Sequence, residues 1–173
     1  PGTHPEKGAY FTRGTSHDEY ARYTEDGNIN AQTLTRLMRK FRTATDLVPE
    51  PIIEINGEDS CGVIYYGSSK PAVLEAKDIL KTKNINLDLM QIRSFPFNLD
   101  VWEFIANHDR IYVVEQNRDS QMRTLIMAEG GISAEILRPL VHFTGDPIEA
   151  SYIVNKISER EVNYKSHKNI KER

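Results

Sequence analysis

The segment VVEQNRDSQM gathers polar side chains of types that could do chemistry. The apolar run Ile111–Glu115 ends in this segment, and a helical pattern starts at Asp119. Open α/β sheets bind ligands just beyond the carboxyl ends of their parallel strands. No serine, cysteine or histidine nucleophile–base pair accompanies the segment, and acid–base work would need a partner carboxylate of defined role. We interpret Asp119 as a helix cap and expect an exposed polar edge that contacts a neighbouring domain or subunit, formed by Glu115, Asn117, Arg118 and Gln121.

A second candidate is the turn YGSSKPAVLEA, which follows a strand pattern and opens a helix. The free backbone N–H groups of such a turn make Ser68 and Ser69 a candidate anion site. Neither G-x-G-x-x-G nor G-x-x-x-x-G-K-[ST] occurs here. Helix capping by one of the serines, with Pro71 in the first turn, explains the residues equally well. An anion- or nucleotide-binding module is the alternative.

The segment SHDEYARYTED near the start of the chain places one histidine among several acids. Its spacing matches no zinc or facial-triad pattern, and the other four histidines are scattered. We therefore expect no metal site in this chain. We interpret the segment as a polar arm laid over another surface, with its candidate contacts at His17, Asp18, Glu19, Arg22 and Tyr23.

Composition excludes several classes of protein. The 173 residues are 39% hydrophobic and carry a formal net charge of -3, which argues against nucleic-acid binding. The single cysteine, Cys61, excludes an internal disulfide and a four-cysteine iron–sulfur cluster; it begins an apolar run and is expected to be buried. No apolar run reaches the roughly 20 residues of a membrane span, and no signal-peptide pattern opens the chain. A cytoplasmic protein is expected.

The elements that must position these residues alternate along the chain. Strands are predicted at Ile52–Ile55, Gly62–Tyr66, Leu87–Ile92, Ile111–Glu115 and Glu135–Val141. Helices are predicted at Ala31–Leu47, Pro71–Lys81, Asn98–Asn107, Asp119–Ala128 and Pro147–Ser158. The runs GVIYY and IYVV are continuously apolar, as expected for strands covered on both faces. The pattern indicates βαβ units and a mostly parallel sheet with helices on both sides.

Three regions follow from this pattern. Residues 1–48 form a connecting arm and an amphipathic helix, residues 49–158 form the α/β domain, and residues 159–173 form a charged tail that is a frayed helix end or disordered. In the first helix, an apolar stripe is expected to face inward: Leu34, Leu37, Met38, Phe41 and Ala44. The basic residues of RLMRKFR then lie outward, as a solvated face or a protein-docking face.

Six segments in order make the chain recognisable: SHDEYARYTED, RLMRKF…VPEP, GVIYYGSSKPAVLEA, MQIRSFPF, VVEQNRDSQMRTL and HFTGDPIEASYIV. Together they resemble the C-terminal part of the alpha subunit of 2-oxoacid:ferredoxin oxidoreductases. The resemblance runs from about Gly8 to Ile157, and the version with VVEQNRDSQ looks most like the 2-oxoglutarate type.

The resemblance implies a fold and an activity. Such enzymes use thiamine diphosphate, Mg²⁺, iron–sulfur clusters and coenzyme A to convert a 2-oxoacid to an acyl-CoA and CO₂, with reduction of ferredoxin. The matching domain is similar to the transketolase C-terminal domain, a three-layer α/β/α sandwich with a mostly parallel five-stranded sheet. The family's thiamine motifs lie in a preceding pyrimidine-binding domain, and its beta subunit holds the diphosphate and magnesium.

No catalytic or cofactor residue therefore transfers to this chain, and the fragment alone is expected to be inactive. Its implied role is assembly with the pyrimidine-binding domain, the thiamine-binding beta subunit and a second copy of the complex as a homodimer. The equivalent domain of another thiamine enzyme, such as a 2-oxoacid dehydrogenase beta subunit or deoxyxylulose phosphate synthase, is the alternative within this fold. The physiological 2-oxoacid is not encoded in these residues.

Overall fold

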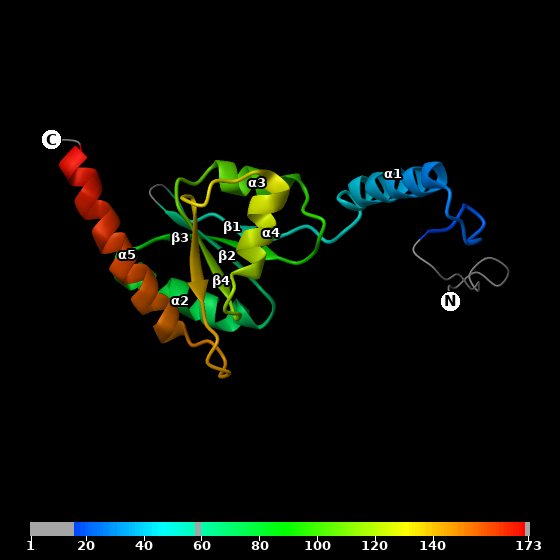
Figure 1. The fold of residues 1–173 in the computed structure, drawn as a ribbon. Helices are drawn as coiled ribbons and strands as arrows, with labels where there is room; N and C mark the ends of the chain where they lie inside the picture. The colour runs from blue at the N-terminus through cyan, green and yellow to red at the C-terminus, as the bar shows by residue number, and fades with distance from the viewer. Residues whose placement is uncertain (1–15, 58–59, 172–173) are drawn as a thin grey trace. The chain divides into compact units, whose positions relative to one another are not determined.

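The computed structural model describes residues 16–57 and 60–171, which belong to two compact units, 1–48 and 49–173 (Figure 1). The first fifteen residues of the predicted arm lie outside the described residues, as do 58–59 and 172–173. The first unit contains the arm and one helix, and the second contains the sheet.

The second unit is built on one five-stranded sheet with the strand order β1-β3-β2-β4-β5. Its strands are β1 (Ile52–Glu54), β2 (Cys61–Tyr66), β3 (Leu87–Ile92), β4 (Ile111–Glu115) and β5 (Leu137–Val141). β1 pairs antiparallel with β3, whereas the other three pairs are parallel. The mostly parallel five-stranded sheet of the prediction is confirmed.

Helices cover both faces of the sheet and complete three layers (Figure 1). They are α2 (Lys70–Thr82), α3 (Leu99–Ala106), α4 (Gln121–Gly130) and α5 (Ala150–Lys171), with a 3-10 turn η1 (Gly67–Ser69) before α2. α2 and α5 pack on one face, α3 and α4 on the other. Side chains alternate between the faces: Tyr112 and Val114 of β4 join the α2/α5 cluster, and Ile111 and Val113 join the α3/α4 cluster. The apolar runs are continuous because both faces are buried.

The predicted strands agree closely with the observed ones. Leu87–Ile92 and Ile111–Glu115 have the predicted bounds, and the other three differ by one or two residues at one end. Cys61 is 1% exposed and packs in the α2/α5 cluster, which confirms its predicted burial.

Helix α5 is longer than predicted. It runs from Ala150 to Lys171 instead of ending at Ser158, so the boundary of the expected charged tail falls inside a helix. The reason is a buried carboxylate in this extension, because Glu161 is 2% exposed. Arg110 Nε donates to it at 3.0 Å and the Tyr112 hydroxyl donates at 2.8 Å. Arg110, which directly precedes β4, and Tyr112 on β4 thereby hold this charged part of α5 against the sheet.

In the first unit, α1 (Gly27–Ala44) begins and ends earlier than the predicted Ala31–Leu47. The Asp26 side chain accepts a hydrogen bond from the Asn28 N–H and caps the helix at this earlier point. The described arm contacts α1 through the Thr33 hydroxyl, which donates to the His17 carbonyl at 3.2 Å.

The apolar stripe of α1 does not face a core, so this part of the prediction is wrong. Leu34, Leu37, Met38 and Phe41 are 54%, 38%, 60% and 54% exposed, and α1 has no buried residue. The described residues of the first unit are one helix and a short arm, which cannot enclose an apolar face of this length. Periodicity identified the stripe correctly, but periodicity does not show whether a cover exists.

Candidate functional site

The candidate site is the polar rim at the carboxyl ends of β2 and β4, and Glu115 lies at its centre. This side chain is fully buried, at 0% exposure. Its carboxylate accepts hydrogen bonds from the Met122 N–H at 2.7 Å, the Arg123 N–H at 3.0 Å and the Asn117 side-chain amide at 2.8 Å. The Tyr66 hydroxyl is a fourth, longer donor at 3.5 Å. The expectation that Glu115 lies on an exposed edge is therefore wrong.

The alternation of β4 explains where this carboxylate goes. Ile111 and Val113 face the α3/α4 layer, so Glu115 faces the same layer and meets the start of α4. Helices leave their first N–H groups without internal partners and favour negative charge there. Glu115 thus occupies the position that an external anion would otherwise take at this helix.

Gln116 continues the alternation onto the opposite face, and sequence reasoning did not single it out. Its side-chain amide donates to the Ser68 hydroxyl at 2.9 Å and to the Ser69 hydroxyl at 3.4 Å. Its side-chain oxygen accepts from the Ile148 N–H at 3.1 Å. One glutamine therefore ties the turn before α2 to the loop before α5. The period of two along β4 is the signal that could have identified it.

The two serines have these structural partners rather than an exposed hydroxyl pair. Ser69 is 2% exposed and stands at the N-cap position of α2, as predicted for one of the serines, but its side chain makes no capping bond. Pro71 lies in the first turn of α2, as expected. Both serine hydroxyls bond Gln116, so the anion site proposed at Ser68 and Ser69 stays a prediction.

Capping of α4 differs from the prediction that Asp119 caps it. The N-cap residue is Ser120, with a left-handed φ of 51° and no side-chain capping bond. The acceptors come from earlier residues: the Asn117 side-chain oxygen accepts from the N–H groups of Asp119 and Gln121, at 3.1 and 3.2 Å. Together with Glu115 these bonds satisfy the helix start, so the Asp119 carboxylate is not needed there.

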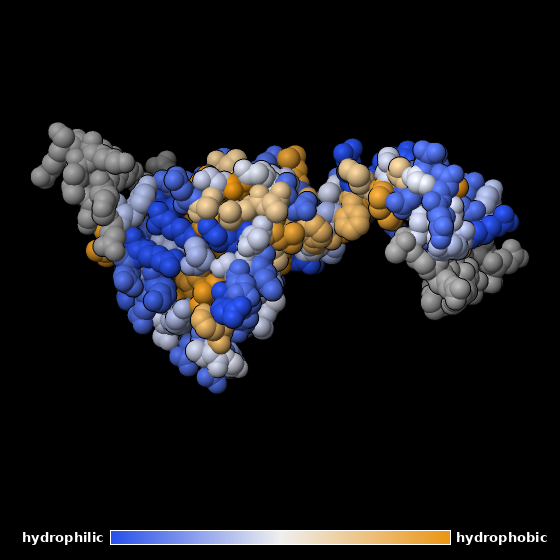
Figure 2. All heavy atoms as spheres, viewed as in Figure 1, coloured by the Kyte–Doolittle hydropathy of each residue, from blue (hydrophilic) through white to orange (hydrophobic). Residues whose placement is uncertain are grey.

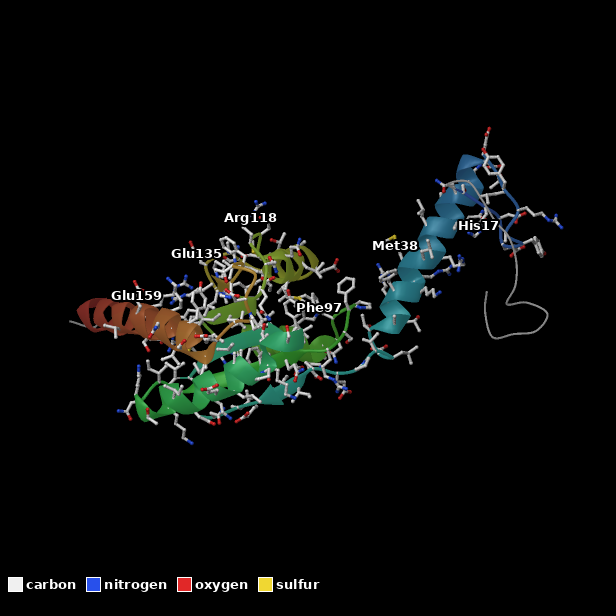
Figure 3. All side chains as sticks on the ribbon, turned by 90° about the horizontal axis from the view of Figure 1, so that it is seen from below. His17, Met38, Phe97, Arg118, Glu135 and Glu159 are labelled. Carbon is white, nitrogen blue, oxygen red and sulfur yellow. The ribbon has the colours of Figure 1, made fainter. Side chains whose placement is uncertain are left out.

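Asp119 instead pairs with Arg118 at the surface. Arg118 Nε donates to the Asp119 carboxylate at 2.7 Å, and the two side chains are 74% and 57% exposed. Figure 3 shows Arg118 directed away from the body of its unit. Gln121 is also exposed, at the first turn of α4. The rim thus buries Glu115 and presents Arg118, Asp119 and Gln121 outward.

The chemistry that this rim can support is limited by its saturated bonds. Glu115 has donors on both carboxylate oxygens, which leaves it poorly placed to take a proton from a substrate. Burial, followed by the nearby Glu115 charge, raises the pKa of the Tyr66 hydroxyl. The neutral Tyr66 hydroxyl and the fully bonded Glu115 carboxylate therefore have a structural role, which is to join β4 to the start of α4.

In the first unit, the five predicted contact residues of the arm form a local turn. His17 and Tyr23 make an isolated antiparallel bridge, and the Asp18 carboxylate accepts from the N–H groups of Tyr20 and Arg22, both at 2.9 Å. The Tyr23 hydroxyl donates to Glu25, while Glu19 is exposed. These side chains do not converge on one point.

Within 16–57 and 60–171, no three side chains of the metal-binding types are grouped closely enough to hold an ion. Over the same part of the chain, no helix has the length and apolar character needed to cross a membrane.

Comparisons with known proteins show sequence similarity to one kind of enzyme subunit. The alpha subunit of 2-oxoacid:ferredoxin oxidoreductase 2 from Aeropyrum pernix is 28% identical over 155 residues, which cover 84% of this chain and 24% of that protein. The alpha subunit from Saccharolobus solfataricus is 28% identical over 124 residues, covering 69% of this chain and 20% of that protein. The chain is similar in sequence to the alpha subunits of 2-oxoacid:ferredoxin oxidoreductases. It spans about a quarter of the length of these relatives.

A solved structure shares the fold. The 2-oxoglutarate:ferredoxin oxidoreductase from Magnetococcus marinus, with 2-oxoglutarate, coenzyme A and succinyl-CoA bound, matches 90% of this chain and 27% of its own, with a TM-score of 0.74 and 22% identity. At this identity the match supports the fold. No family model matches the chain.

Proposed function

We propose that this chain is a non-catalytic assembly domain from the alpha subunit of a thiamine-diphosphate-dependent 2-oxoacid:ferredoxin oxidoreductase of the 2-oxoglutarate type. The complete enzyme would convert a 2-oxoacid and coenzyme A to an acyl-CoA and CO₂ and reduce ferredoxin in the cytoplasm. Similarity to the alpha subunits over 69% to 84% of the chain supports the family.

One observation carries the assembly role: Glu115, Gln116 and the two serines at the sheet rim have their hydrogen bonds within the fold, and Arg118, Asp119 and Gln121 are exposed beside them. Glu115 accepts bonds from two backbone N–H groups of α4 and from Asn117, and Gln116 bonds both serines. Open α/β sheets that bind ligands leave such groups available at the strand ends. Here the same groups rigidify a loop that carries exposed Arg118.

The residues of this chain do not fit an iron–sulfur cluster. A cubane or plant-type cluster needs four thiolates, and the sequence has one cysteine, Cys61. Burial and then the Glu161 charge raise the pKa of this thiol to about 12, which opposes thiolate formation. We therefore assign the clusters, thiamine diphosphate, Mg²⁺ and coenzyme A to other parts of the enzyme and derive no catalytic step for this chain.

The proposed partners are the pyrimidine-binding domain of the same subunit, the thiamine-binding beta subunit and a second copy of the complex, with ferredoxin as the electron acceptor of the whole enzyme. The proposed contacts belong to two clusters. On the rim they are exposed Arg118 and Gln121 with half-buried Asn117. On the arm they are exposed Glu19, Arg22 and Tyr23 with half-buried His17 and Asp18. Glu115 supports the rim contact from below the surface.

The test is assembly of the complete enzyme with Arg118→Glu in the alpha subunit. The reversed charge stands at the tip of a rigid loop, so a contact there should weaken while the fold stays intact. Co-expressed alpha and beta subunits are compared by size-exclusion chromatography with light scattering. The expected result is a loss of co-elution for Arg118→Glu.

The matched control is Lys83→Glu, which reverses an exposed charge just after α2. Lys83→Glu should assemble like the unmodified enzyme. Equal assembly of both variants would refute the rim contact, and loss of assembly in both would show a general charge effect instead of a specific surface.

A further inference from the structure

Two half-buried arginines on the α2/α5 side of the sheet have no carboxylate partner among the described residues. Arg138 lies on β5 and Arg160 on α5. Arg138 Nη1 donates to the Tyr112 hydroxyl at 3.4 Å, and Arg160 Nη1 donates to the Pro139 carbonyl at 2.9 Å. A guanidinium has five N–H donors, so most donors of each side chain are left for solvent or a ligand.

The two guanidinium groups gather around one aromatic ring. The central carbon of each lies 5.8 Å from the centre of the Tyr112 ring, and that of Arg138 lies 5.6 Å from the Tyr164 ring. The Tyr112 hydroxyl gives its proton to Glu161 and accepts from Arg138. Both cations therefore contact Tyr112, which is neutral and does not balance the charge of either.

The nearby acids already belong to a third arginine. Arg110 Nε donates to the Glu161 carboxylate at 3.0 Å, and Arg110 Nη1 donates to the Asp109 carboxylate at 2.9 Å. The Tyr164 hydroxyl also donates to Asp109 at 2.6 Å. The cluster therefore has three cations and two acids, a net charge of +1, and both acids bond to Arg110 instead of to Arg138 or Arg160.

Both arginines keep part of their surface exposed to solvent. Figure 2 shows strongly hydrophilic side chains gathered between α5 and β5. Arg138 and Tyr112 lie opposite each other near the starts of β5 and β4. The cluster is thus at the other end of the strands from the rim, and it does not depend on the assembly role proposed there.

We propose that Arg138 and Arg160 form a binding site for a phosphate-type oxyanion, with Tyr112 and Tyr164 as its aromatic wall. Two like charges held near one another while losing solvent cost free energy, and a bound dianion between them removes that cost. Planar guanidinium groups match phosphate oxygens with paired hydrogen bonds. The pair favours a phosphate over a monocarboxylate because a phosphate offers enough oxygens and charge to bond both guanidinium groups at once.

The experiment is a titration of the complete 173-residue chain with inorganic phosphate at constant ionic strength, followed by the arginine Nε–H signals in ¹H–¹⁵N NMR spectra. The expected result is a saturable shift of the Arg138 and Arg160 signals with a Kd of about 1 mM. Arg138→Gln and Arg160→Gln should each raise that Kd by roughly tenfold, the loss of about one charge-assisted hydrogen bond.

Arg93→Gln is the matched control, because Arg93 is an exposed arginine at the other end of the strands that donates to the Glu50 carbonyl. This variant should bind phosphate like the unmodified chain. Acetate at the same concentration should cause no saturable shift. The absence of saturation with phosphate, an unchanged Kd in both site variants, or equal binding of acetate would each overturn the proposal. Fluorescence of the single tryptophan, Trp102, reports whether each variant is folded.

Discussion

Replacing Glu115 by alanine tests the hydrogen bonds that join β4 to the start of α4 at the sheet rim. The substitution removes a fully buried carboxylate that accepts from two backbone N–H groups of α4 and from the Asn117 amide. The donors belong to half-buried residues that point toward the fully buried Glu115 carboxylate, so they lose an acceptor that water replaces only in part. The start of α4 and the loop before it are the parts expected to loosen.

The magnitude follows from the three short bonds. A hydrogen bond to a charged group contributes about 1.5 to 3 kcal/mol in mutational series. Three bonds at the low end give roughly 4.5 kcal/mol, and neighbouring bonds are not independent, so the expected loss is about 3 to 4 kcal/mol in the free energy of unfolding. Glu115→Gln should cost roughly half as much in the free energy of unfolding. Its remaining side-chain oxygen still accepts hydrogen bonds, whereas its amide nitrogen places a donor against a backbone N–H group.

Urea unfolding measures this loss through circular dichroism and the fluorescence of Trp102, which packs in the same α3/α4 cluster as α4. Asp119→Ala is the control, since an exposed ion pair contributes about 0 to 1 kcal/mol. Hydrogen exchange adds a local measurement: the amides of Met122 and Arg123 should lose protection in Glu115→Ala. If Glu115→Ala and Asp119→Ala were equally stable, Glu115 would not be the anchor of α4, and the rim would be available for chemistry after all.

Two further predictions concern the α5 side of the sheet. Glu161→Ala leaves Arg110 buried without its main partner and should destabilise the domain by about 3 to 5 kcal/mol in urea unfolding. Glu159 is exposed, so Glu159→Ala should have little effect. Similar losses in both variants would show that the buried pair does not hold α5. Cys61 should resist alkylation at pH 8 in the native chain and react after unfolding, as read by mass spectrometry. Burial and then the Glu161 charge raise the pKa of this thiol from 9.0 to about 12, so its contribution to stability is complete below pH 9 and is lost as the pH rises toward 12; fast native labelling would contradict the burial.

The sheet could be predicted from the sequence because its signals are local. Continuous apolar runs such as Ile111–Glu115 show strands covered on both faces, and helical patterns between them show the parallel crossovers. Boundaries were less accurate where a cap was decisive. Asp26 caps α1 so that it starts at Gly27, four residues before the predicted Ala31. At α4, Asn117 and Glu115 replace the expected cap.

Long-range pairs account for the remaining differences. Nothing in the segment after Ser158 shows that Glu161 meets Arg110, which precedes it by 51 residues, so the helical extension was not predictable from local pattern. The direction of Glu115 was partly predictable, because the period of two in β4 points it toward the helix that follows. The exposed stripe of α1 was not, since a hydrophobic face does not show what covers it.

The assembly role is tested most directly by comparing the isolated 173-residue chain with the complete enzyme. Reduction of a dye acceptor is measured with 2-oxoglutarate and coenzyme A, and thiamine diphosphate binding is measured by calorimetry in the presence of Mg²⁺. The expected result is no turnover and no measurable binding for the chain alone, with both restored in the assembled complex. Turnover, or saturable binding of thiamine diphosphate by the chain alone, would contradict a role in assembly without chemistry.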